Sequence, residues 1–182
     1  MLTMNNGQTR QSGDKLGTKI HAHFLSNKQD WETPNNLYLW AHATFGPFDL
    51  DAAANPANAK ADTYLSETDD ALTCSWGSGI AWCNPPYANL MPKFVQRAWD
   101  EVSKGDLQRA VLLVPCRTET KIFQDVVFPN ACEVYFLGKR IKFVGARDYA
   151  PFPACLVIFD KNLSGPAKLE FGRDWVTFGV DD

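Results

Sequence analysis

Residues 80–90, IAWCNPPYANL, combine an apolar run with Asn84, two prolines and an aromatic ring. Each proline restricts the residue before it to extended geometry and has no N–H to donate. The loop is therefore stiff and rich in unpaired carbonyl oxygens. Such a loop can hold hydrogen-bond acceptors at fixed positions beside a flat ring, which suits a planar substrate that carries an amino group.

The chemistry of an exocyclic amino group on a purine accounts for these residue types. Its lone pair is conjugated with the ring, so the nitrogen is a poor nucleophile. Two acceptors that grip its hydrogens favour a pyramidal nitrogen and stabilise developing positive charge. The Asn84 side-chain oxygen and the Pro85 carbonyl are the candidate acceptors, with Pro86 stiffening the loop. Tyr87 offers a face on which a flipped base can stack.

The elements that must position this loop alternate between strands and helices. Thr33 as N-cap, Pro34 as first helical residue and Gly46 predict one helix, and apolar spacing predicts an amphipathic helix over residues 90–102. A short helix is expected at 118–128. Strands are expected at 48–50, 63–65, 79–83, 109–116, 132–137, 140–144 and 154–159.

This order predicts an α/β sandwich whose last strands form an antiparallel hairpin. Ligands of such sheets bind outside the carboxyl ends of the strands. Because DLDAAA (residues 49–54) and the NPPY loop both follow predicted strands, they are expected to line one crevice.

Length and composition favour one folded domain. The chain has 182 residues, 45% of them apolar, and a net charge of −3. We expect a flexible polar arm over residues 1–25 and a single domain over 26–182. The five cysteines form no CxxC pair and the three histidines no HExxH pattern, so no metal site is expected. No apolar stretch resembles a membrane span or a signal peptide, which favours a cytoplasmic location.

The ordered motifs resemble the phage-type DNA adenine methyltransferases, whose fourth motif is [DNS]-P-P-[YFW]. The matching segments cover most of residues 30–160: DWETP, FDLDAAANPANAK, DDAL, WCNPPY, RIKF and APFPACLVIF. The resemblance implies a three-layer Rossmann-like methyltransferase sandwich with a mixed sheet. It also implies S-adenosylmethionine as the cofactor and, as the substrate, an adenine flipped out of duplex DNA in a bacterial cell or phage-infected host.

The same resemblance assigns residues to the cofactor. Thr33 and Pro34 match the element that closes over the methionine end, and Trp31 of this motif is either a ligand contact or a hydrophobic staple. Asp51 matches the first motif but is also suited to cap the segment after it. Asp70 resembles the position that accepts a hydrogen bond from the cofactor's adenine amino group, although Asp69 and Asp70 are also compatible with a solvated acidic pair.

The first motif departs from the family pattern. It has DAAAN in place of a glycine run, and only eighteen residues separate Asp51 from Asp70. This spacing leaves little room for the strand and helix that usually intervene. Either this half of the sheet is abbreviated, or Asp51 or Asp70 has another role.

Cations interrupt the late strands at Lys139, Arg140 and Lys142. They are expected either to contact DNA phosphates beside the crevice or to lie on a solvated hairpin. Two other functions stay open because methyltransferases of other substrates share the NPPY motif. One is methylation of RNA or of a protein side-chain amide, and the other is nucleic-acid binding by a catalytically silent relative.

Overall fold

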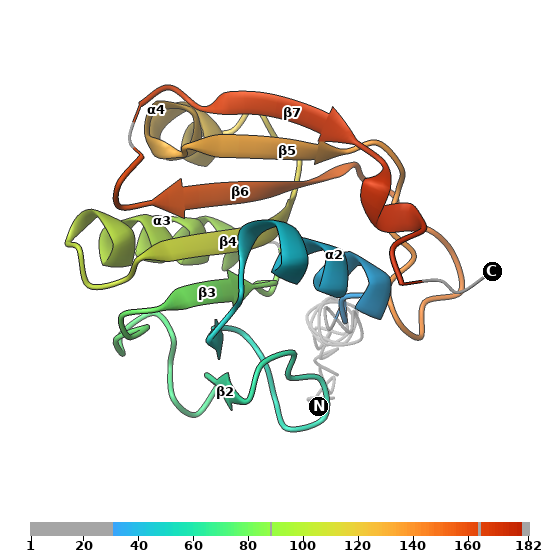
Figure 1. Ribbon diagram of the computed structural model, residues 1–182, viewed down its shortest axis with the longest axis horizontal. Helices are drawn as coiled ribbons and strands as arrows, with labels where there is room; N and C mark the ends of the chain where they lie inside the picture. Colours follow the sequence, from blue (N-terminus) through green and yellow to red (C-terminus); the bar gives the residue numbers. More distant parts are fainter. Residues whose placement is uncertain (1–30, 88, 164, 180–182) are drawn as a thin grey trace, which may run out of the picture.

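The computed structural model describes residues 31–87, 89–163 and 165–179, and the arm expected at residues 1–25 lies outside them. A seven-stranded sheet in the order β2-β1-β3-β4-β6-β5-β7 forms the centre of the molecule (Figure 1). The elements in chain order are α2 (Asn35–Phe45), β1 (Leu50–Asp51), β2 (Thr63–Tyr64), β3 (Ile80–Cys83), α3 (Met91–Ser103), β4 (Arg109–Pro115), the π-helix η1 (Ile122–Val127), α4 (Phe128–Asn130), β5 (Glu133–Leu137), β6 (Ala154–Asp160), β7 (Lys168–Gly172) and the 3-10 helix η2 (Asp174–Val176).

The sheet is mixed and lies between two helical layers. Strands β1 to β4 run parallel, whereas β6 pairs antiparallel with both β4 and β5. β7 runs parallel to β5 at one edge. α2 covers one face, and α3, η1 and α4 cover the other (Figure 1). The predicted three-layer α/β sandwich with a mixed sheet is confirmed.

β4 shows how the sequence builds the two halves of the core. Ala110, Leu112 and Val114 belong to the cluster that includes α3, and the intervening Val111 and Leu113 belong to the cluster that includes α2. Successive side chains of a strand point to opposite faces, so a central strand that is covered on both sides needs an uninterrupted apolar run.

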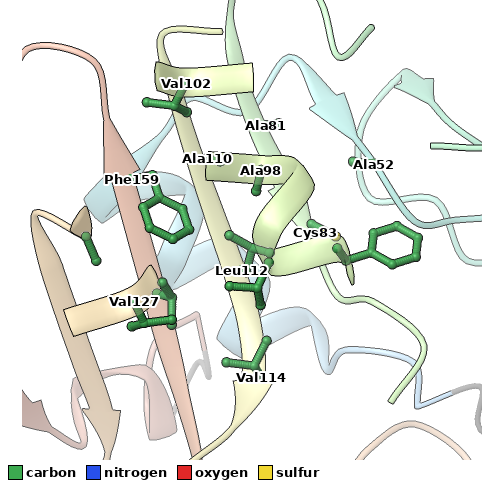
Figure 2. Close-up of a cluster of buried hydrophobic side chains, with 14 of the residues drawn as sticks. Ala52, Ala81, Cys83, Ala98, Val102, Ala110, Leu112, Val114, Val127 and Phe159 are labelled. Atoms are coloured by element: carbon green, nitrogen blue, oxygen red, sulfur yellow. The ribbon is translucent and has the colours of Figure 1, made fainter. Parts of the chain in front are cut away.

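Small side chains line the contact between α3 and the sheet. Ala98 of α3 lies in one buried cluster with Ala81 of β3 and Ala110 of β4 (Figure 2). Alanine at these positions lets the helix axis approach the strands closely. This packing places β3, and with it the NPPY loop, firmly in the sheet. No helix in the described ranges is long and apolar enough to cross a membrane.

The start of α2 differs from the prediction. Pro34 is the N-cap, with extended backbone (φ −61°, ψ 142°), and no side chain caps the helix. The first residue of the helix is Asn35. The predicted N-cap Thr33 was therefore wrong, because its hydroxyl is engaged by Asn84 in the site described below.

The predicted strand at 140–144 was also wrong. Ile141 and Phe143 are buried and alternate with exposed residues as in a strand, but residues 139–143 have no strand partner. The backbone bonds here run instead from Ala150 N to Ile141 O (2.8 Å) and from Val144 N to Glu32 O (3.0 Å). The edge strand beside β5 is β7, which was not predicted from the sequence. The antiparallel neighbours β5 and β6 are thus joined by a long connection, residues 138–153.

The stretch between Asp51 and Asp70 is short because it holds a two-residue strand and no helix. Residues 52–62 form a loop, β2 covers Thr63–Tyr64, and turns follow up to residue 70. Of the two explanations for the short spacing, the structure shows an abbreviated half of the sheet.

Candidate active site

A cavity of about 500 Å³ lies at the carboxyl ends of β1, β2 and β3. Asp51 ends β1, Leu65 follows β2 and Asn84 follows β3, and all three line the cavity. Its volume is in the range of small-molecule binding sites. The expectation that DLDAAA and the NPPY loop line one crevice is confirmed.

The cavity brings together most of the residues that the sequence singled out. The predicted catalytic and cofactor residues in its lining are Trp31, Thr33, Asp51, Asp70, Asn84, Pro85 and Pro86. Pro34 and Tyr87 do not line it, and neither do the three cations of residues 139–142. In the described ranges, no group of three or more His, Cys, Asp or Glu side chains is placed to hold a metal ion.

Asn84 is held by hydrogen bonds at both ends of its carboxamide. Its Nδ2 donates to the backbone oxygen of Trp31 and to Thr33 Oγ1, the latter at 3.1 Å. Its Oδ1 accepts a hydrogen bond from the Tyr87 hydroxyl at 3.1 Å. An amide oxygen has two lone pairs. Among the described residues, one lone pair of Asn84 Oδ1 therefore has no hydrogen-bond donor.

Tyr87 is buried, with 7% of its surface exposed. Its ring packs edge-on against Phe152 at 5.5 Å and Phe143 at 6.3 Å, both from the 138–153 connection. Burial raises the pKa of the Tyr87 hydroxyl, so this group stays protonated and donates to Asn84. Stacking of a base on Tyr87 remains a prediction, and it requires the ring to become accessible from the cavity.

Asp51 has the capping role that the sequence offered, and its cofactor-binding role stays a prediction. Its Oδ1 accepts from Ala53 N (3.3 Å) and its Oδ2 from Lys60 N (3.1 Å), so it ties down the loop after β1. It also lines the cavity. Only 3% of Asp51 is exposed, and burial raises its pKa to about 6 although these N–H bonds and the charge of Lys60 lower it.

Lys60 and Glu32 form an ion pair in the cavity wall that the sequence analysis missed. Lys60 Nζ lies 3.1 Å from Glu32 Oε1 and 2.9 Å from Asn35 Oδ1. Both charged residues line the cavity. Glu32 lies in the DWETP segment and Lys60 in the FDLDAAANPANAK segment, 28 residues later. No local sequence pattern indicates that these two side chains meet.

Asp70 and Asp69 differ in their surroundings. Asp70 lines the cavity with an exposed side chain, and its carboxylate accepts from Leu72 N (3.3 Å) and Thr73 Oγ1 (3.0 Å). Its backbone is in the left-handed region, at φ 54°. Asp69 instead bonds the backbone and hydroxyl of Ser66. Only Asp70 of this pair is thus placed to meet a ligand in the cavity.

Trp31 packs against the buried cluster that includes α2 and also lines the cavity, so both of its predicted roles stay predictions. Its ring packs against Phe143 at 5.1 Å and Phe152 at 6.0 Å, on the 138–153 connection. The same connection carries Lys139, Arg140 and Lys142, all exposed. Arg140 Nη1 donates to Ala150 O (3.2 Å) and Lys139 Nζ lies 5.8 Å from the Tyr149 ring. The cations therefore lie on the segment that packs against the NPPY loop and Trp31.

Comparisons with known proteins agree with this geometry. Residues 22–169 match the family model described as DNA N-6-adenine-methyltransferase (Dam). The chain belongs to this family. A DNA N-6-adenine-methyltransferase of Haemophilus phage HP1 is 34% identical over 144 residues, which cover 74% of this chain and 80% of the phage protein. Another, from Escherichia phage T1, is 28% identical over 108 residues, covering 59% of this chain and 44% of that protein.

Proposed function

We propose that this DNA adenine methyltransferase takes its methyl group from S-adenosylmethionine and acts on an adenine flipped out of duplex DNA. Family membership establishes the reaction class, methylation of adenine N6 in DNA, and favours it over RNA or protein substrates. The observation that carries the proposal is the second lone pair of Asn84 Oδ1, on a residue that lines the same cavity as the carboxylates of Asp51 and Asp70. The phage relatives support a place in the cytoplasm of an infected cell.

The cavity suits the proposed cofactor. Asp51 and Asp70 supply carboxylates for a ligand that carries a sulfonium and an ammonium group, and Asp70 can accept from its adenine amino group. Three alanines, Ala52 to Ala54, line the wall where the family pattern usually has glycines. When bound, S-adenosylmethionine supplies an electrophilic methyl group. Although alanines replace the glycine run of the family pattern, the cavity still has a volume of about 500 Å³, which is in the range of small-molecule sites.

The NPPY loop would prepare the amino group of adenine for attack. Asn84 Oδ1, with the Pro85 carbonyl as the second proposed acceptor, would hold the two N6 hydrogens. Because both acceptors are fixed before the reaction, they need not reorganise as positive charge develops on the nitrogen. The rest of the rate enhancement would come from alignment of N6 with the methyl group.

Transfer of labelled methyl groups tests the proposal directly. With methyl-labelled S-adenosylmethionine and duplex DNA, the label should appear as N6-methyladenine and become acid-soluble on DNase treatment. Label released instead by RNase or protease would show another substrate. Absence of S-adenosylmethionine binding in calorimetry would show that the chain is a silent relative.

Removing Asp70 is expected to weaken S-adenosylmethionine binding by roughly 1.5–3 kcal/mol, because a charged hydrogen bond is lost. Calorimetric titration of Asp70→Ala measures this loss. Asp62→Ala is the matched control, because Asp62 is exposed in the same abbreviated segment and does not line the cavity. An unchanged affinity in a folded Asp70→Ala variant would leave Asp70 with its turn-forming role alone.

Three of the four cations of the 138–153 connection, Lys139, Arg140 and Lys142, are expected to contact DNA phosphates. Replacing Lys139, Arg140 and Lys142 together with alanine should weaken DNA binding similarly for all sequences. It should also flatten the salt dependence of log K by up to about 0.9 per lost contact. Lys104→Ala combined with Lys161→Ala is the control, because these exposed lysines lie by the opposite ends of the parallel strands. An unchanged salt slope in the triple variant would show that the three cations are only solvated.

A further inference from the structure

The acceptor role proposed for Asn84 depends on which way its carboxamide faces. A half-turn about the last side-chain torsion exchanges Nδ2 and Oδ1, and an exposed asparagine populates both orientations readily. Only one orientation offers an acceptor to an incoming amino group. The other would offer N–H donors to it, and the amino hydrogens would meet no acceptor on this side chain.

The three groups that surround the carboxamide do not select its orientation equally. The hydroxyls of Thr33 and Tyr87 can each donate or accept, so they tolerate either orientation. The backbone oxygen of Trp31 can only accept, and it takes a hydrogen bond from Asn84 Nδ2. A flipped carboxamide would bring Asn84 Oδ1 against this carbonyl. The Trp31 carbonyl therefore decides the orientation, and Thr33 Oγ1 satisfies the second Nδ2 hydrogen.

The segment that carries these two acceptors is itself held by the 138–153 connection. The Trp31 ring packs on Phe143 and Phe152, and Glu32 O accepts a hydrogen bond from Val144 N at 3.0 Å. Thr33 is 2% exposed. Water is therefore largely excluded from Thr33, and an Asn84 N–H that lost its partner there would stay unsatisfied, at a cost in free energy.

We propose that Trp31 and Thr33 are positioning residues for Asn84: the Trp31 carbonyl selects the orientation of the carboxamide, and the Thr33 hydroxyl holds it in place by accepting from the second N–H. Both line the cavity, but the effect proposed for them on the methyl-transfer step is to keep the Asn84 carboxamide fixed with its oxygen as the acceptor. This inference rests on the proposed acceptor role of Asn84. It also gives a reason why a segment more than fifty residues from the NPPY loop in sequence lies against it.

The test compares Thr33→Val with Thr33→Ser. Valine has nearly the same shape as threonine but accepts no hydrogen bond, whereas serine keeps the hydroxyl. At saturating S-adenosylmethionine and DNA, Thr33→Val should slow single-turnover methylation about tenfold, the effect of one buried hydrogen bond. Thr33→Ser should stay near the parental rate. The affinity of both variants for S-adenosylmethionine should change by less than about twofold, less than the loss of one hydrogen bond to the cofactor would cause, because the bond removed is the one from Asn84.

A double-mutant cycle separates positioning from an independent effect. Thr33→Val should have no further effect in an Asn84→Ala background, because the group that it positions is already absent. The side-chain amide resonances of Asn84, identified by their loss in Asn84→Ala, should lose protection from hydrogen exchange in Thr33→Val.

Two results would overturn the inference while leaving the proposed function intact. One is a Thr33→Val variant that binds S-adenosylmethionine more weakly but reaches the parental rate at saturation, which would make Thr33 a cofactor contact. The other is a rate loss that persists in full in the Asn84→Ala background. If Asn84→Ala itself reacts at the parental rate, the acceptor role is wrong and the positioning role is rejected with it.

Discussion

Methyl transfer by an Asn84→Ala variant is expected to be slower on the order of a hundredfold or more, the usual effect of removing one preorganised electrostatic group. The substitution deletes the proposed acceptor but keeps Pro85, Pro86 and β3. The fold and the affinity for S-adenosylmethionine should therefore persist. Single-turnover kinetics with saturating cofactor and DNA measure the chemical step apart from binding.

The control for Asn84→Ala must exclude a rate loss caused by misfolding, since the substitution also removes hydrogen bonds that Asn84 donates. Because Asn84 also bonds Trp31 and Thr33, thermal melting and calorimetry must show that the variant is folded and binds the cofactor. Asn89→Ala is a matched substitution of an exposed asparagine just after the NPPY motif, outside the cavity lining. It should react at the parental rate. If a folded, cofactor-binding Asn84→Ala variant also reacts at the parental rate, the acceptor role of Asn84 is refuted.

The affinity for S-adenosylmethionine is expected to fall below pH 6, by up to about tenfold per pH unit, if its cationic end lies beside Asp51. The physical reason is that burial raises the pKa of Asp51 to about 6 in the free protein, so the carboxylate loses its charge below that pH. An α-ammonium group stays protonated throughout the range from pH 4.5 to 6.5. Calorimetric titrations across this range, on the parent and on Asp51→Asn, should show an affinity that falls with decreasing pH only in the parent.

The free energy of unfolding gives a second measurement for Asp51. It should decrease as pH rises, whereas the affinity for S-adenosylmethionine should increase. A carboxyl whose pKa is raised on folding favours the folded state below its unfolded pKa of 3.8, and this contribution is lost as pH rises through about 6. Relative to Asp51→Asn, the parent should lose about 3 kcal/mol of stability across that window. If the stability slope appears but the affinity does not depend on pH, Asp51 is buried as expected but only ties down the loop after β1.

The amino-acid sequence determined the parts of this protein that depend on local pattern. The uninterrupted apolar run of β4 indicates a strand covered on both faces, and the spacing in residues 90–102 indicates the helix α3. Both rest on periodicities that are set by backbone geometry alone. The meeting of Asp51 with the NPPY loop followed from a rule of similar generality, because the carboxyl ends of parallel strands share one edge of the sheet.

The same periodicity was misleading where no neighbouring strand was available. Ile141 and Phe143 alternate with exposed residues because one side of this segment is buried, and burial of one side does not require a hydrogen-bonded ladder. Conversely, β7 pairs with β5 although most of its side chains are exposed, because it is an edge strand. Its pattern of Leu169 and Phe171 between charged residues carries little signal of burial.

Only the tertiary structure decided how the site is assembled. The bonds of Asn84 to Trp31 and Thr33, the ion pair of Lys60 with Glu32 and the packing of the Tyr87 ring all join segments tens of residues apart. The direction of a side chain within a known loop depends on which groups the rest of the fold brings beside it. Sequence motifs therefore identified most of the residues that line the cavity, whereas long-range packing determined the hydrogen-bond partners of the Asn84 carboxamide and left Tyr87 outside the cavity lining.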